Sequence, residues 1–515
     1  MTRFDVKIIL SACVLFLCLA FPAAAERINH EGRIMGSQPV VTNAILFNTT
    51  NADAVLSTLQ IFPVTNPWNE CISNRPVMAN STAMISQITN DLATNRQTLR
   101  VFKEMNFILA PDSQPLKPFE FLDYPDESDL NGGVFPSGLY PIPTNMPVET
   151  WPSETGGLTL QQWQQDTNDV GGDRHSIIVQ PGNGNFWETW QAKLTGTNWQ
   201  ASNGAKFNLS TNGLRPAGWT SGDAAGLPMF PALVRFDECE RGMVEHAMRI
   251  VVKRSRYGTY LYPATHYAAP STNTSTNLPM MGQRLRLKSS YVINTNWTKQ
   301  EKSVLLGLKK YGAMVADNGG FFSISATPDD RWPAGCFDHL NTINVTNFEV
   351  VQATGPSEGP RSPGAPTANA GADQTAAPGV LLPLQGAVSF SNTPTIQWKL
   401  YSGPGTVTFG NASQTNTTAN FSATGIYTLM LSANDGVHAV AYDAVVVNVV
   451  QGITVVAAPA GASLNLSWSG GLPPFVVERS AGLSPASWSA VMTSGVANAS
   501  IPITGGSGFF RVRGN

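Results

Sequence analysis

One stretch of the sequence gathers carboxylates among apolar residues. Residues 222–249 read GDAAGLPMFPALVRFDECERGMVEHAMR and hold five acids and one histidine. The residue pattern predicts a strand, a turn and a second strand. Asp223 is the first candidate for chemistry, because a lone acid in an apolar, glycine-bounded turn has few structural reasons to be there. Asp237 is the second candidate, and we expect Glu240 and Glu245 on the wet surface.

Paired carboxylates in this setting indicate cleavage of a glycosidic bond. In that reaction one carboxyl group protonates the leaving oxygen, and another attacks the sugar or activates water. The predicted catalytic residues are Asp223, Asp237, Glu188 and His246. Glu188 lies between aromatic residues on its strand face, and aromatic rings stack on sugars. The structural alternative is that the acids are solvated and His246 is a hydrogen-bonded core residue.

Eight further residues are predicted to bind the substrate. They lie on short strands or in turns and supply charges, hydrogen-bonding groups and one large ring: Asp173, His175, Trp190, Arg235, Arg249, His266, Arg284 and Asp317. Strand alternation puts Asp173 and His175 on one side, and it points Arg249 away from the face of His246.

Two other functions remain open on these residues. A polysaccharide lyase uses a neutral His or Tyr base and an Arg that neutralises a uronate carboxylate. The residues that could supply this set are His246, Arg249, His266, Tyr267 and Arg284. In a non-catalytic glycan-binding or adhesion protein, the aromatic residues would bind sugar and the acids would only decorate the surface.

The chain lacks the sequence motifs of several common kinds of enzyme. The chain has no H-E-x-x-H or C-x-x-C pattern, no P-loop, no G-x-G-x-x-G after a strand and no G-x-S-x-G. A metal site from His175, His246, His266 and Glu188 would lack a close ligand pair, so we expect no metal and no other cofactor. Only 13% of the residues are charged and the net charge is -3. This composition excludes a broad basic field for nucleic acid and favours a polysaccharide or cell-surface glycan as partner.

The N-terminus has the three parts of a secretory signal. Arg3 and Lys7 precede the apolar run Ile8–Phe21, and small residues end at Ala25. We expect a signal peptide over residues 1–25 and a secreted protein, extracellular or periplasmic. No later segment reaches the roughly 18 consecutive apolar residues of a membrane span, so we expect no span. We also expect the chain to be a monomer. The cysteines left after residue 25 allow at most one disulfide.

Residues 26–352 are predicted to form a β-sandwich or jelly-roll-like domain, so the fold class is mainly β. Short alternating segments such as RHSIIVQ and GGFFSISA, broken by Gly, Pro and Asn, indicate antiparallel strands. Two amphipathic segments, 81–102 and 298–312, predict packing helices. Thr298 and Glu301 have capping-box spacing in the second of these segments.

The remaining chain is predicted to form two small β-sandwich modules. Residues 353–365 form a Pro/Gly/Ser-rich linker. Residues 366–450 resemble a PKD domain in NAGADQ, Trp398, GIYTLMLSANDG and DAVVVNVV, which implies an Ig-like spacer or adhesion module. Residues 451–515 resemble a fibronectin type III domain. The N-terminal domain resembles an uncharacterised group of secreted microbial proteins in GDRH, GWTSGDAAGLP and LKKYGAMVADNGG. This resemblance implies a common family but does not identify a reaction.

Overall fold

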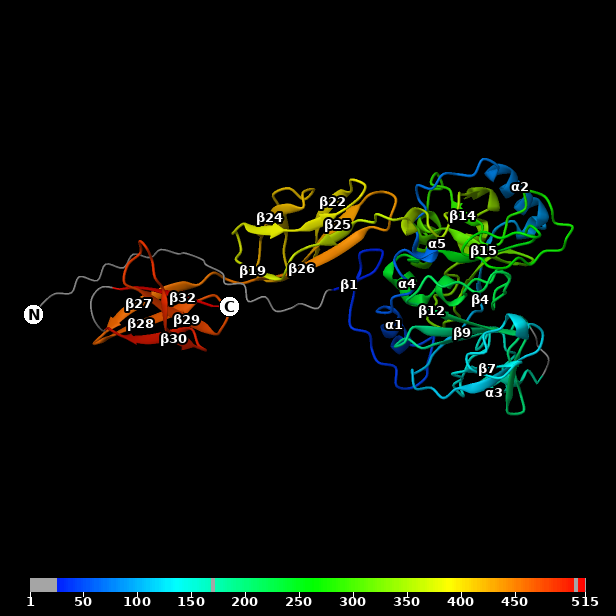
Figure 1. Ribbon diagram of the computed structural model, residues 1–515, viewed down its shortest axis with the longest axis horizontal. Coiled ribbons are helices and arrows are strands. Elements are labelled where there is room, and N and C mark those ends of the chain that lie inside the picture. Colours follow the sequence, from blue (N-terminus) through cyan, green and yellow to red (C-terminus); the bar gives the residue numbers. More distant parts are fainter. Residues whose placement is uncertain (1–25, 168–171, 504–507, 515) are drawn as a thin grey trace, which may run out of the picture. The chain divides into compact units, whose positions relative to one another are not determined.

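The computed structural model describes residues 26–167, 172–503 and 508–514 (Figure 1). Strands hold 34% of the residues and helices 14%, so the predicted mainly β class is confirmed. The chain divides into two compact units, described separately below. Among the described residues, the N-terminal unit is residues 29–363 with 437–439, and the C-terminal unit holds the rest. The predicted signal peptide lies outside the described residues.

A six-stranded sheet forms the centre of the N-terminal unit. Its strand order is β17-β14-β15-β13-β16-β4. The strands are β4 (Leu99–Lys103), β13 (Met248–Val252), β14 (Arg284–Leu287), β15 (Ala313–Asn318), β16 (Phe322–Ala326) and β17 (Phe348–Val350). The pairs β13–β15 and β16–β4 are parallel. Purely antiparallel pairing was predicted here, and it is wrong at these pairs because period-2 alternation does not report strand direction.

Two smaller sheets complete the strands of this unit. One has the order β12-β9-β8-β5-β3 and the other β10-β11-β6-β7. Their strands are β3 (Ile45–Leu46), β5 (Ile108–Leu109), β6 (Lys117–Phe121), β7 (Ser137–Tyr140), β8 (Ser176–Val179), β9 (Asn185–Trp190), β10 (Lys193–Thr195), β11 (Asn198–Ala201) and β12 (Asn203–Asn208). β5–β8 and β11–β6 are parallel pairs. The short strand β2 (Ile34–Met35) also belongs to this unit, whereas β1 (Arg27–Ile28) belongs to the C-terminal unit.

Both predicted helices are present. They are α2 (Ser81–Asp91), shorter than the predicted segment, and α5 (Lys299–Lys310), which begins with reciprocal bonds between Thr298 and Glu301. The other helices are α1 (Thr50–Leu56), α3 (Leu160–Gln165), α4 (Phe236–Arg241) and the 3-10 turns η1 (Pro67–Asn69), η2 (Thr94–Arg96), η3 (Pro125–Glu127), η4 (Phe230–Ala232), η5 (Asp338–Thr342), η6 (Val345–Asn347) and η7 (Gly359–Arg361).

Helix α4 occupies a position where the sequence predicted a strand, and that prediction is wrong. Asp237 and Glu238 lie in its first turn, where acidic side chains favour a helix N-terminus. Gly242 ends the helix with a φ of 101°, a left-handed conformation that suits glycine. These local signals outweigh the apparent alternation of VRFDECE.

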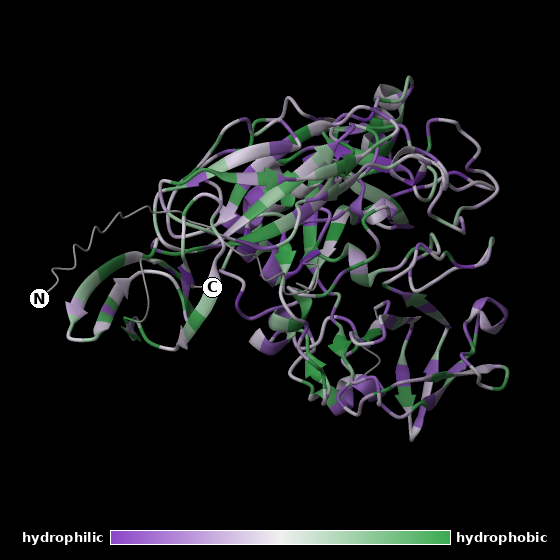
Figure 2. Cartoon of the chain, turned by 60° about the vertical axis from the view of Figure 1, so that its left-hand side comes forward, coloured by the Kyte–Doolittle hydropathy of each residue, from purple (hydrophilic) through white to green (hydrophobic). Residues whose placement is uncertain are grey.

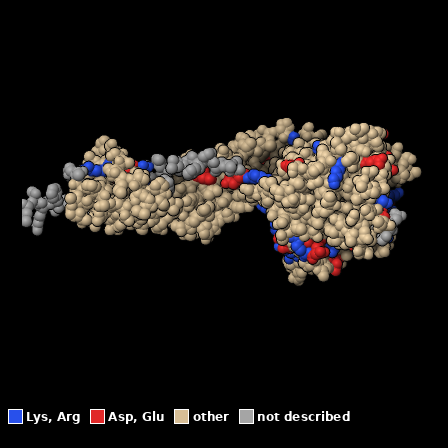
Figure 3. Space-filling view, turned by 90° about the horizontal axis from the view of Figure 1, so that it is seen from below, with Lys and Arg blue, Asp and Glu red and all other residues tan. Residues whose placement is uncertain are grey.

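Aromatic side chains fill the cores of the N-terminal unit. Phe230 packs edge-on against Phe107 at 5.3 Å between ring centroids and contacts Phe186 at 5.8 Å. Trp163 and Trp187 are buried in a second core under the four-stranded sheet, so these indoles serve packing. Figure 2 shows hydrophobic residues, in green, along many of the strands. The face in Figure 3 is mostly uncharged, as the composition predicts.

The C-terminal unit contains two sets of paired sheets. The first comprises β18 (Thr367–Asn369), β19 (Gln374–Ala376), β20 (Leu382–Gln385), β21 (Ala387–Ser389), β22 (Thr395–Ser402), β23 (Val407–Phe409), β24 (Asn416–Phe421), β25 (Gly425–Asn434) and β26 (Ala441–Val449). Its main sheets are β19-β26-β25-β22 and β20-β24-β23, and Trp398 lies in their core. The second comprises β27 (Thr454–Ala460), β28 (Ser463–Ser469), β29 (Phe475–Ser480), β30 (Ser489–Ser494), β31 (Asn498–Pro502) and β32 (Phe509–Arg513). Its sheets are β27-β28-β31 and β30-β29-β32, around Trp468 and Phe475.

Candidate active site

A buried arginine on β13 organises the strongest candidate site. Arg249 donates to both carboxylate oxygens of Asp223, at 2.8 Å from Nε and 2.7 Å from Nη2. Its Nη1 donates to Ser325 Oγ on β16 at 2.7 Å. The side chains of Arg249 and Asp223 are 3% and 0% exposed. A bidentate pair this deeply buried has a fixed orientation, because neither partner can exchange the other for water.

The backbone around Asp223 explains how this acid reaches β13. Ser221 Oγ accepts from the Asp223 backbone N–H at 3.0 Å, and the Gly226 N–H donates to the Asp223 carbonyl oxygen at 3.0 Å. The Ala225 N–H donates to the carbonyl oxygen of Ala316 on β15 at 3.0 Å. The turn predicted from the glycine-bounded sequence is therefore fastened to the strand that carries Asp317.

Asp317 is the point where this network reaches solvent. Its Oδ2 lies 3.8 Å from Arg249 Nη2, and its side chain is 28% exposed. A register shift in the β13–β15 pairing sets Val251 opposite Asp317. Burial and the charge of Asp223 together raise the pKa of Asp317 to about 7, although Arg249 opposes the shift. Asp317 can therefore hold a proton near neutral pH and release it.

Two further carboxyl groups, Glu104 and Glu149, are influenced by the charge of Arg249 and were not predicted from the sequence. Ser325 Oγ donates to Glu104 Oε1 at 2.9 Å, and the Thr150 N–H donates to the Glu104 carbonyl oxygen at 2.7 Å. Glu149 Oε2 accepts from the His175 N–H at 3.2 Å. Burial raises the pKa of Glu104 and of Glu149 to about 7, and the charge of Glu149 adds to the shift at Glu104. Each is an isolated acid in its sequence, so no spacing signal singled it out.

The backbone is strained on both sides of this carboxyl pair. Thr150, next to Glu149, has a φ of 67°, and Arg174, next to His175, has a φ of 48°. Such conformations cost a residue with a side chain roughly 1–3 kcal/mol and concentrate at functional sites. We call the Asp223, Arg249, Ser325, Asp317, Glu104, Glu149 and His175 set the Arg249 network.

His175 and Asp173 join this network, but they precede β8 and the φ of 48° at Arg174 breaks the strand alternation that was predicted for them. His175 is 3% exposed, and burial lowers its pKa to about 4, so its ring is neutral at neutral pH. Its Nδ1 has no hydrogen-bond partner within the part of the chain that the structure describes. Asp173 is exposed, and its charge raises the pKa of both His175 and Asp317. Asp173 and Asp317 both contact solvent, and the charge of Asp173 acts on Asp317.

His266 and Glu188 also lie next to Asp223. His266 Nδ1 lies 2.7 Å from the Ala224 carbonyl oxygen, and the His266 ring is half-buried. Glu188 on β9 is fully buried, and its carboxylate accepts the N–H groups of Met229 and Phe230 at 2.7–3.0 Å. Burial raises the pKa of Glu188 to about 8 despite these bonds. Glu188 thus anchors the chain before η4 and has no path to a substrate.

Three predicted residues belong to a different network, on α4. Arg235 and His246 both bind Glu238, at 2.7 Å and 3.0 Å, and Asp237 pairs with Arg241. These groups line a cavity of about 30 Å³ together with His30 and other side chains. Asp223 pairs with Arg249 and Asp237 pairs with Arg241, so the structure places the preferred catalytic pair in separate networks.

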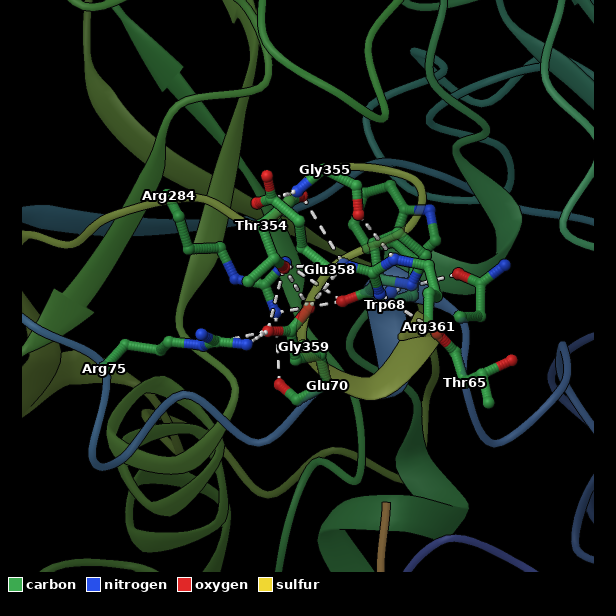
Figure 4. A network of polar contacts seen from close by, with 12 residues as sticks. Thr65, Trp68, Glu70, Arg75, Arg284, Thr354, Gly355, Glu358, Gly359 and Arg361 are labelled. Atoms are coloured by element: carbon green, nitrogen blue, oxygen red, sulfur yellow. Dashed lines mark hydrogen bonds and ion pairs between the residues drawn. The ribbon is translucent and has the colours of Figure 1, made fainter. Parts of the chain in front are cut away.

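Arg284 and Trp190 lie outside the Arg249 network as well. Arg284 is buried and donates to the carbonyl oxygens of Pro67, Glu70 and Tyr311. Figure 4 shows Arg284 and Glu70 within one polar network. Trp190 is half-buried, with its ring 6.2 Å from that of Tyr124. Arg284 thus has a structural role.

Some features bear on cofactors, membranes and thiols. Residues 26–167, 172–503 and 508–514 contain no group of three His, Cys, Asp or Glu side chains placed to hold a metal ion. Over the same ranges no helix is long and apolar enough to cross a membrane. Cys71, Cys239 and Cys336 are free thiols.

The chain matches no known protein family and no curated protein. Among solved structures it is similar to the PKD domain of the KIAA 1837 protein, with 26% identity over 16% of this chain and 84% of that chain and a TM-score of 0.15. The PKD domain of human KIAA0319 is 20% identical over 19% and 91%, with a TM-score of 0.15. A nucleoside hydrolase-related hypothetical protein from Saccharophagus degradans is 18% identical over 25% and 35%, with a TM-score of 0.16. TM-scores this low carry no information about function, so the function has to be inferred from the residues of the site.

Proposed function

We propose that the N-terminal unit is a glycoside hydrolase within a secreted, modular protein, and that Asp317 is its proton donor. The observation that carries the proposal is the Arg249 network, a buried set of charges that reaches solvent at Asp317, on which the charge of the exposed Asp173 acts. A carboxyl group with a pKa of about 7 is suited to donate a proton at neutral pH.

In the proposed reaction two carboxyl groups act on opposite sides of the glycosidic bond. Asp317 gives its proton to the leaving oxygen as the bond from that oxygen to the anomeric carbon breaks. A water molecule attacks the anomeric carbon, and Asp173 accepts the proton that this water loses. The products are two shorter sugars, one with a new reducing end.

Asp223 and Arg249 are positioning residues in this scheme. The carboxylate of Asp223 has no exposed surface and so does not touch the sugar. Its charge raises the pKa of Asp317, and its bidentate bond holds Arg249 beside Asp317. Removal of either group would therefore change the protonation of Asp317 as well as the local packing.

The lyase alternative is less well supported by the contacts of Arg249. A lyase needs a cation that is free to neutralise a uronate carboxylate. Arg249 already binds Asp223 through two nitrogens and Ser325 through the third, and it is 3% exposed. Of the two proposed reactions, hydrolysis is the one that needs no further cation.

The C-terminal unit supports a modular arrangement. Its two sets of paired sheets fit the PKD-like and fibronectin-like resemblances of residues 366–450 and 451–515. We propose that these modules hold the N-terminal unit at an insoluble glycan outside the cell, with the chain as a monomer.

The test is an incubation of the full chain with neutral and uronate-containing polysaccharides. We expect new reducing ends without unsaturated products, and we expect Asp317→Asn to lose at least about 99% of the rate, since loss of a general acid costs typically 10²–10⁴-fold. Asp330→Asn, at an exposed acid, is the matched control and should keep full activity. Unsaturated products would indicate a lyase instead of a hydrolase. Binding of the chain to a glycan without any product would indicate a binding protein.

A further inference from the structure

Two tyrosines form an aromatic surface beside the Arg249 network. Tyr257 is 43% exposed and meets Tyr267 edge-on, at 5.2 Å between centroids and 81° between planes. Tyr267 is half-buried and stacks on His266 at 5.8 Å and 13°. We call Tyr257, Tyr267 and His266 the aromatic platform.

The platform is fixed to the network on both sides of Tyr267. Before it, His266 Nδ1 binds the carbonyl oxygen of Ala224, the neighbour of Asp223. After it, the Ala268 carbonyl oxygen accepts from Asn318 Nδ2, and Asn318 is the neighbour of Asp317. Each anchor is one residue away from a carboxylate of the site. The backbone on either side of Tyr267 is therefore fixed to the two segments that carry Asp223 and Asp317.

Further bonds make the platform rigid. The N–H groups of Thr265 and His266 both donate to the Ala225 carbonyl oxygen, at 3.0 Å and 3.2 Å. The Tyr257 N–H donates to the Asn273 carbonyl oxygen at 2.9 Å. A ring that is already ordered loses little conformational freedom when a ligand stacks on it.

The charges of the Arg249 network favour an uncharged sugar as the ligand of the aromatic platform. Asp173 and Asp317 are acids of the network that contact solvent, and the donors of Arg249 bind Asp223 and Ser325. A carboxylate on the sugar would be repelled by Asp173 and would gain no bond from Arg249. An uncharged ring can stack its C–H face on the tyrosines and turn its hydroxyl groups to the acids.

We infer that the aromatic platform is a subsite that binds one neutral sugar ring of the substrate, next to the bond that is cleaved. This inference deepens the proposed function and rests on it for the position of the bond. The affinity for the sugar does not depend on cleavage, so the two can be tested apart.

The test measures binding by calorimetry in the Asp317→Asn background, where the proposed function predicts no cleavage. The ligands are xylohexaose, mannohexaose and cellohexaose, with hexagalacturonate as the charged counterpart. We expect at least one neutral ligand to bind and hexagalacturonate to bind at least about tenfold more weakly, a difference of about 1.4 kcal/mol. Tyr267→Ala should weaken the neutral ligand about tenfold or more, and Tyr267→Phe by less than about threefold.

Phe135→Ala is the matched control, because Phe135 is also an exposed aromatic residue, 56% exposed, of the same unit. It should leave the affinity unchanged, and circular dichroism should show all variants folded. Affinity lost in Tyr267→Ala without any hydrolysis by the wild-type chain would support the subsite and overturn the hydrolase. Hydrolysis with an unchanged affinity in Tyr267→Ala, no binding of any neutral ligand, or preference for hexagalacturonate would overturn the subsite.

Discussion

Among single residues, Asp223 acts on several ionisable groups of the N-terminal unit at once. It holds Arg249 through two hydrogen bonds and influences the pKa of Asp317, Glu188 and His175 by its charge. The cost of burying this ion pair is offset only while both partners are present, because a single buried charge has neither water nor a counter-ion.

Asp223→Asn is therefore expected to destabilise the N-terminal unit strongly. The variant leaves Arg249 buried without its carboxylate, so the free energy of unfolding should fall by about 3–5 kcal/mol. Glu240→Gln is the control, because the Lys299–Glu240 pair is 49% and 44% exposed and should contribute at most about 1 kcal/mol. Urea denaturation measures both changes. Equal losses in the two variants would contradict the structural role assigned to Asp223.

At the scale of elements, the sequence predicted the turn at Asp223 and the helix after Thr298, because glycines and a capping box are local signals. It also singled out Asp173, His175 and Asp317, although as substrate-binding residues. It could not predict that Arg249 would meet Ser325, since that contact depends on pairing between distant strands.

Helix α4 shows the opposite case, where alternation misled the prediction. Its six residues alternate enough to suggest a strand, but the helix carries Asp237 away from Asp223 and into contact with Arg241. Glu104 and Glu149 were missed for a related reason. Each acquires its significance from burial beside a strand of the folded sheet, and sequence spacing does not report burial.

Gly242→Ala tests the assignment of α4. Gly242 has a φ of 101°, and a side chain there would be strained although the space around it is open. We expect the free energy of unfolding to fall by about 1 kcal/mol or more. Gly36→Ala, at a position without a left-handed φ and with ordinary contacts, should be neutral or stabilising by about 0.4–1 kcal/mol. Indistinguishable midpoints for the two variants would count against the helix end at Gly242.

At the scale of the whole molecule, residues 354–361 are fastened to the N-terminal unit (Figure 4). Glu70 accepts from Arg75 at 2.7 Å, from Thr354 at 2.7 Å and from Arg361 at 3.0 Å. Burial would raise the pKa of Glu70, but the charges of Arg284 and Arg361 outweigh it and lower the pKa. Much of the segment predicted as a linker therefore has fixed contacts.

Arg361→Ala should loosen this segment. We expect subtilisin to cleave between residues 353 and 365 at least about tenfold faster, because local opening exposes the backbone once its anchor is lost. Arg254→Ala removes a pair with Asp91 in which Arg254 is 44% exposed, and it should leave the cleavage rate unchanged. If residues 353–365 were cleaved equally fast in the wild-type chain, Arg361 would not be the anchor.

The pH dependence of hydrolysis shows whether Asp317 donates the proton. A donor must be protonated, and the pKa of Asp317 is raised to about 7, so its acid form is present below that pH and is lost above it. We therefore measure kcat/KM for the best neutral polysaccharide from pH 5 to pH 9. We expect kcat/KM to fall about tenfold per pH unit above pH 7 in the wild-type chain and to be lower by at least about 99% at every pH in Asp317→Asn. A rate that rises through pH 7, or an Asp317→Asn variant that keeps the wild-type profile, would contradict it.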